Sequence, residues 1–137
     1  MGTAMTVVEL RDFLAREFPQ SPVAIDTVAR HHASVRQRIG PAQLRPGGTV
    51  SGPTMMALAD TAAYVAILAM IGPVALAVTT NLSITFMRKP AANADLIADA
   101  RLLKLGRRLA VAEIGLHSEG DESLVAHATV TYSIPPR

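Results

Sequence analysis

The chain has 137 residues, half of them hydrophobic, with a formal net charge of +2 and no cysteine. That length is typical of one domain, so we expect a single domain over residues 1–137. A weakly basic chain without interleaved aromatic and basic residues does not fit a nucleic-acid binder, and without cysteine neither a disulfide framework nor a thiolate metal site can form. The N-terminus has no basic start followed by an apolar run, so a signal peptide is not predicted and a cytoplasmic protein is expected.

The first part of the chain predicts one helix and two strands. Residues 6–18 place apolar side chains at helical spacing on one face, and Pro19 ends this short helix. Residues 23–29 and 33–39 have the composition or the alternation of strands. The segment 45–53 is rich in Gly and Pro, which predicts a loop that leads into the next element.

A long apolar helix is predicted over about residues 53–71. Gly-Pro pairs at residues 52–53 and 72–73 supply its start and stop signals. Almost every residue between them is apolar, and Asp60 is the one carboxylate. A helix that is apolar on all sides must be covered, and we expect a β-sheet to wrap it. A membrane span is disfavoured, because a central Asp60 would cost about 3 kcal/mol in hydrocarbon.

The rest of the chain reads as strands. They are predicted over residues 74–87, 96–104, 109–117 and 124–134. Short loops between consecutive strands favour an antiparallel meander. The predicted class is α+β, with a curved antiparallel sheet around one long central helix and a short helix before it.

Three motifs carry a resemblance to a known family. They are GTVSGPTMMALADTA at residues 48–62, TTNLSITFMRKP at residues 79–90, and LGRRLAVAE at residues 105–113. In this order and spacing, the chain resembles the hotdog-fold acyl-CoA thioesterases, in the branch of the phenylacetate-pathway and 4-hydroxybenzoyl-CoA enzymes. The resemblance implies hydrolysis of an acyl-CoA to the free acid and CoA, with no further cofactor and no metal.

The resemblance also implies a site that two subunits share. In that family two copies pair edge to edge into a dimer, which can assemble further into a tetramer. By position, Asp60 is the general base or the nucleophile, the Gly52 N–H polarises the thioester carbonyl, and the Thr79 hydroxyl orients water. We therefore expect Asp60, Gly52 and Thr79 to surround one void at a crevice between two chains.

The chain departs from the family pattern at three positions. Ser51 stands where the family has a His, Pro53 where it has a second Gly, and Arg45 where several relatives have an Asn. Because Pro53 has no N–H to donate, part of the usual oxyanion cradle is missing. A hotdog protein that binds acyl-CoA without turnover is thus an alternative. A hydratase is disfavoured because no His lies near Asp60 in sequence, and a dimer-stabilising role for Asp60 stays open.

The basic residues at strand ends and turns fit the phosphates of CoA, although a solvated surface is the ordinary role of such residues. The four His residues do not form a metal-binding pattern. The predicted contacts to substrate or CoA are Ser51, Arg45, Asn81, Arg88, Lys89, Gly106, Arg107 and Arg108.

Overall fold

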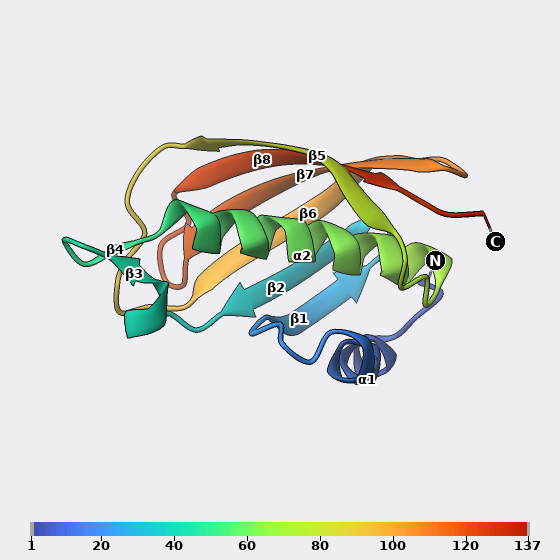
Figure 1. Ribbon diagram of the computed structural model, residues 1–137, viewed down its shortest axis with the longest axis horizontal. Coiled ribbons are helices and arrows are strands. Elements are labelled where there is room, and N and C mark those ends of the chain that lie inside the picture. The colour runs from blue at the N-terminus through green and yellow to red at the C-terminus, as the bar shows by residue number, and fades with distance from the viewer. Residues whose placement is uncertain (1, 137) are drawn as a thin grey trace.

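The computed structural model describes residues 2–136. A six-stranded antiparallel sheet curls around the central helix α2 (Gly52–Ile71), and the short helix α1 (Val7–Glu17) packs beside one edge of the sheet (Figure 1). The expected α+β hotdog architecture is therefore confirmed. The strands of the sheet are β1 (Ala24–Ala29), β2 (His32–Gln37), β5 (Val78–Phe86), β6 (Leu96–Leu105), β7 (Leu109–Ser118) and β8 (Ala126–Ser133).

Both ends of α2 follow from local sequence. The Ser51 hydroxyl accepts a hydrogen bond from the Thr54 N–H at 3.2 Å, which caps the first turn. Gly72 ends the helix with a φ of 97°, and its N–H donates to the Leu68 carbonyl oxygen at 2.9 Å. By length and mean hydropathy α2 could cross a membrane, but 61% of its most apolar stretch is buried inside the protein. It is thus a core helix.

Small side chains fill the space between α2 and the sheet. Because an alanine side chain is a single methyl group, a helix and a sheet that face each other with alanines can approach closely, which accounts for a core with few aromatic residues. The fully buried alanines are Ala59, Ala62, Ala63, Ala66 and Ala69 of α2 and Ala33, Ala98, Ala100, Ala110, Ala112, Ala126 and Ala128 of the strands.

One face of α2 is not covered by the sheet. Pro53, Met56 and Ala57 are exposed, and Asp60 and Tyr64 are half-buried. Their spacing places them in one stripe along the helix. We call this set the open stripe of α2, and it is the face of the helix that a ligand or a second chain can reach.

The strand order corrects the predicted meander. Strands β6, β7 and β8 are consecutive neighbours, but β5 pairs with β8 and β2 pairs with β6, giving the order β1-β2-β6-β7-β8-β5. The connection from β5 to β6 covers residues 87–95, which is longer than the roughly two to five residues of a hairpin loop. It leads the chain away from β5, which becomes an edge of the sheet (Figure 1).

Three local predictions were also wrong. Strand β5 begins at Val78 instead of Val74, because the preceding residues form a turn whose Ala75 carbonyl oxygen accepts a hydrogen bond from the Tyr64 hydroxyl at 3.0 Å. Strand β8 begins at Ala126 and not at residue 124. Residues 45–50 of the predicted loop lie in a small hairpin of β3 (Leu44–Arg45) and β4 (Thr49–Val50), after a 3-10 helix (Pro41–Gln43), and residues 52–53 begin α2.

Candidate active site

Two hydroxyl groups hold one oxygen of the Asp60 carboxylate. Thr79 Oγ1 donates a hydrogen bond to Asp60 Oδ1 at 2.5 Å, and the Tyr132 hydroxyl lies 3.0 Å from the same oxygen. Thr79 and Tyr132 are cross-strand neighbours on β5 and β8, so the sheet itself brings their hydroxyls together. The Tyr132 hydroxyl also lies 3.1 Å from the backbone carbonyl oxygen of Asp60, which fixes it against the helix.

The second oxygen of Asp60 is not held in this way. Among residues 2–136 no side-chain hydrogen bond ends on Oδ2. Asp60 also lines a cavity of about 390 Å³. A carboxylate that lines a cavity, with one oxygen fixed and the other without a partner, is arranged to accept a proton or to attack a bound group. We call this space the acidic cavity, and its walls include Glu17, Phe18, Asp60, Tyr64, Thr79 and Tyr132.

Tyr132 is the site residue that sequence reasoning missed. It lies in phase with Ala128 and Val130 on β8, as an ordinary core side chain would, and only 3% of it is exposed. Burial raises the pKa of its hydroxyl well above the usual range, and the nearby Asp60 charge raises it further. Tyr132 therefore remains a neutral donor at physiological pH. The signal in the sequence that could have identified Tyr132 was its hydroxyl, since a buried tyrosine O–H needs a hydrogen-bond partner.

Tyr64 forms another wall of the same cavity. Its ring lies 6.0 Å from the Tyr132 ring, centroid to centroid, with the planes tilted by 30°. Burial raises the pKa of Tyr64, and the negative charge of Glu17 adds to the effect. The two rings and the Tyr64–Ala75 hydrogen bond make a fixed aromatic wall beside Asp60.

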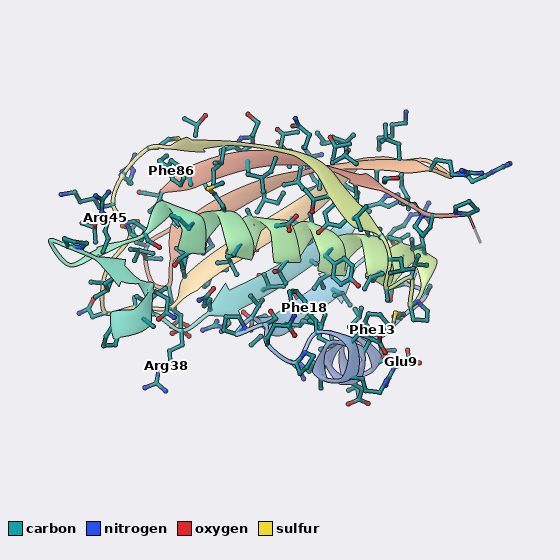
Figure 2. All side chains as sticks on the ribbon, viewed as in Figure 1. Glu9, Phe13, Phe18, Arg38, Arg45 and Phe86 are labelled. Carbon is teal, nitrogen blue, oxygen red and sulfur yellow. The ribbon has the colours of Figure 1, made fainter. Side chains whose placement is uncertain are left out.

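A second cavity, of about 460 Å³, lies at the other end of the open stripe. We call it the cationic cavity, because three basic side chains and no acidic ones line it within the described part of the chain. Arg45 and Phe86 lie at this end of α2 in Figure 2. The Gly52 N–H is also here, and no described residue accepts a hydrogen bond from it. The walls include Arg45, Gly52, Phe86, Arg88 and Lys89.

Within a single chain, Asp60, Gly52 and Thr79 do not surround one void, and the expectation of a shared void between two chains stays a prediction. Asp60 and Thr79 line the acidic cavity, whereas Gly52 lines the cationic one. Gly52 begins α2 and Asp60 follows two turns later, which separates them by about 12 Å along the helix axis.

The other predicted contacts are dispersed. The Ser51 hydroxyl is engaged with the Thr54 N–H and lies 2.8 Å from the Thr54 hydroxyl. Asn81 is exposed on the edge strand β5. The turn with Gly106, Arg107 and Arg108 lies between β6 and β7, at the end of the sheet where β5 begins, and it lines neither cavity. In residues 2–136 no group of three His, Cys, Asp or Glu side chains is placed to hold a metal ion.

Comparisons with known proteins agree with the fold described above. A crystal structure of a candidate thioesterase from Silicibacter sp. TM1040 is 51% identical to the chain with a TM-score of 0.91, and the match covers 99% of this chain and 96% of that one. The phenylacetic acid degradation protein PaaI from Thermus thermophilus, solved as a point mutant, is 29% identical with a TM-score of 0.74, covering 85% and 96%. A hypothetical thioesterase from Streptococcus pneumoniae TIGR4, solved with coenzyme A, is 18% identical with a TM-score of 0.78, covering 93% and 98%. A comparison with curated proteins finds no match.

The model of the family described as the thioesterase superfamily matches residues 47–132. This segment holds the whole of α2, the Asp60–Thr79–Tyr132 contact and most of the cationic cavity. The match spans more than half of the sequence, and the motif-based resemblance is thereby confirmed: the chain belongs to the thioesterase superfamily.

Proposed function

We propose that the protein hydrolyses an acyl-CoA thioester to the free acid and CoA, with Asp60 as general base or nucleophile. The observation that carries the proposal is the Asp60 carboxylate, with Oδ1 fixed by two hydroxyls and Oδ2 without a partner among the described residues, beside a cavity. Membership of the thioesterase superfamily supports thioester hydrolysis as the reaction type.

Either route balances without a metal or a further cofactor. In the first, Asp60 takes a proton from water, the hydroxide oxygen bonds to the thioester carbon, the C–S bond breaks, and the CoA thiolate leaves and is protonated. In the second, the carboxylate attacks the same carbon and expels the thiolate, and water then hydrolyses the mixed anhydride. In both, Thr79 and Tyr132 hold the carboxylate in place during the reaction.

A second copy of the chain would bring the two cavities together. The edge strand β5 runs alongside the open stripe, because Thr79 contacts Asp60 at one end and a Cβ on Gly52 would lie 3.4 Å from the Phe86 ring at the other. Met56 is halfway between Gly52 and Asp60 on α2. A two-fold axis near Met56 and the middle of β5 would therefore place Gly52 of the second copy beside Asp60 of the first.

The surface around this axis has the character of an interface. Met56 is 40% exposed, and Val78 and Phe86, at the two ends of β5, are 54% and 47% exposed. Strand β5 carries no charged residue, although edge strands normally need charge or proline to avoid pairing. An antiparallel pair of β5 strands would extend the sheet across two copies. The dimer is thus part of the proposal, and a tetramer requires a further contact.

The charges of the two cavities determine the orientation in which acyl-CoA would bind. Within residues 2–136 the acidic cavity contains Glu17 and Asp60 and no cation, so it repels phosphates and suits an apolar acyl group. The cationic cavity offers Arg45, Arg88 and Lys89. In a dimer the acyl group would lie in the acidic cavity of one copy and the CoA phosphates near the cations of the other. The protein of the same fold that was solved with coenzyme A supports this choice of substrate.

The test is hydrolysis of acyl-CoAs of varied length by the intact protein and by Asp60→Asn. General-base or nucleophilic catalysis predicts a loss of about 10²–10⁴ in kcat for Asp60→Asn. Asp12→Asn, which changes an exposed carboxylate on α1, is the matched control and should match the wild-type protein. Equal rates for Asp60→Asn and the wild-type protein would rule out the mechanism.

A binding protein without turnover is the second candidate. Two observations favour it: Pro53 supplies no N–H to an oxyanion, and the Ser51 hydroxyl caps the helix instead of facing a ligand. Calorimetry that shows tight binding of acyl-CoAs, together with no release of free CoA across the whole panel, would select this function over hydrolysis.

A further inference from the structure

We propose that Phe18 is the end wall of the acyl site and sets the longest acyl chain that the protein accepts. The cavity behind Phe18, beneath α1, is the space into which the site would extend without this ring. The inference rests on the proposed function, because it assigns the acyl group of the substrate to the acidic cavity.

Phe18 is the one described residue that lines both the acidic cavity and a third cavity, of about 330 Å³, between α1 and β1. It follows the last residue of α1 and is half-buried. Figure 2 labels Phe18 where α1 approaches β1 and the central helix. Phe18 is thus shared by the walls of two spaces of similar size.

The acyl chain would approach Phe18 along a mostly apolar path. From Asp60, the open stripe continues through Tyr64, and the walls opposite include Ala77 and Val78. The Tyr64 hydroxyl is bonded to the Ala75 carbonyl oxygen, so its ring is held in place and its polar end is satisfied. An extended hydrocarbon that starts at the carbonyl carbon beside Asp60 therefore ends at Phe18, with Glu17 keeping anions out.

The cavity behind Phe18 has the chemistry of an extension of this path. Its walls include Leu14, Ala15, Val23 and Ile25, together with Pro19, Ser21 and Ala24. Arg11, the charged residue among its described walls, is directed to the protein backbone, since its Nε and Nη2 donate to the Ile25 carbonyl oxygen at 3.2 and 2.8 Å. These bonds hold α1 against β1, so the walls that the two elements form stay in place. The cavity between them can then receive further methylene groups of the acyl chain.

The test is the dependence of binding and hydrolysis on chain length for Phe18→Ala and Phe18→Trp. The binding probes are S-alkyl-CoA thioethers with alkyl chains as long as acetyl to palmitoyl groups, and calorimetry measures their affinity. The hydrolysis probes are the thioesters of the same chain lengths, and the release of CoA measures their turnover. In the wild-type protein, affinity should rise by a factor of about four per methylene and then level off where the chain meets Phe18.

Phe18→Ala should move that plateau to longer chains, and Phe18→Trp should move it to shorter ones. Two variants with opposite expected shifts keep the test valid if one of them does not fold, which circular dichroism would reveal. Val8→Ala removes an apolar side chain that is 63% exposed on the same helix, and it should leave the profile unchanged.

The outcomes separate this inference from the proposed function. Folded Phe18 variants with the wild-type length profile would overturn the inference, and hydrolysis by the wild-type protein would still stand. A shifted binding profile without any hydrolysis would support the inference and reject the hydrolase. A wild-type protein whose binding does not depend on chain length would overturn the inference.

Discussion

The two cavities at the ends of the open stripe differ in almost every chemical respect. The acidic cavity has a fixed carboxylate, two tyrosines and apolar walls, whereas the cationic cavity has three basic side chains and the Gly52 N–H, which no described residue accepts. Thioester hydrolysis needs groups of both kinds at one carbonyl. A single chain keeps them two helical turns apart, so in our proposal the reaction depends on a second copy.

After Asp60→Asn, the largest expected effect comes from charging the edge strand that runs past both cavities. Ser83→Lys introduces an exposed cation near the middle of β5, where two copies would place like charges next to each other across the axis. We expect a monomer by analytical ultracentrifugation and a loss of activity of about a hundredfold or more, because removing oriented stabilising groups has effects of this size.

Thr27→Lys is the matched control for this prediction. Thr27 is exposed on β1, the other edge of the sheet, which is short, carries Asp26 and packs against α1. This variant should keep the assembly and the activity of the wild-type protein. An active monomeric Ser83→Lys protein would show that one chain holds a complete site.

Removing the Tyr132 hydroxyl should have the next largest effect. Tyr132→Phe deletes one of the two donors to Asp60 Oδ1 and keeps the ring. Since hydrogen bonds to charged groups contribute about 1.5–3 kcal/mol, we expect kcat to fall by about tenfold to a hundredfold with little change in KM. Combined with Asp60→Asn, the same change should cost almost nothing further.

Tyr64→Phe is the control, because its hydroxyl bonds to the Ala75 carbonyl oxygen and not to Asp60. A loss of kcat of the same size in both tyrosine variants would mean that the effect of Tyr132→Phe does not come from its hydrogen bond to Asp60.

Substitution of the cations should act on binding instead of on the chemical step. Arg88→Ala combined with Lys89→Ala removes two of the three basic side chains of the cationic cavity. We expect KM to rise by about tenfold and kcat to change little, with a weaker dependence of KM on salt. The double variant Arg107→Ala and Arg108→Ala tests the other basic cluster, and a larger rise in KM there would move the phosphate site to the β6–β7 turn.

The smallest effect concerns stability at alkaline pH. The folded protein raises the pKa of Tyr132 above its unfolded value of about 10, so its contribution is complete below pH 10 and is lost as the pH rises further. The free energy of unfolding should fall by up to about 1.4 kcal/mol per pH unit above that point for this residue. Urea titrations should show a shallower decline for Tyr132→Phe, and parallel curves for the two proteins would contradict the assignment.

Most of the fold could be predicted from local sequence patterns. The central helix was predictable because its boundaries and its apolar composition are encoded in consecutive residues, and the strands followed from alternation. The pairing of β5 with β8 was not predictable in this way, because it joins segments far apart in sequence. The β3–β4 hairpin has only two residues per strand, which is too short for a periodic pattern.

The candidate site likewise includes residues that the sequence could reveal and residues that it could not. Asp60 was recognisable because a lone carboxylate in an apolar helix is costly without a partner or a purpose. Thr79 came from the family motif. Tyr132 was hidden because its inward position matches that of the core residues around it. The spacing of Gly52 and Asp60 within one helix already separates them by about two turns, but the motifs do not show whether a second copy brings the two groups together.

The alanine layer beneath α2 has a consequence for how such a protein can diverge. Fully buried alanines face each other between α2 and the sheet, and a larger side chain that overpacks this layer would cost about 1–3 kcal/mol. Outward-facing positions do not share this packing constraint, whereas the distance between α2, which carries Asp60, and the strands is held constant. New specificities would then arise from substitutions on one surface, while the interior of the scaffold stays the same.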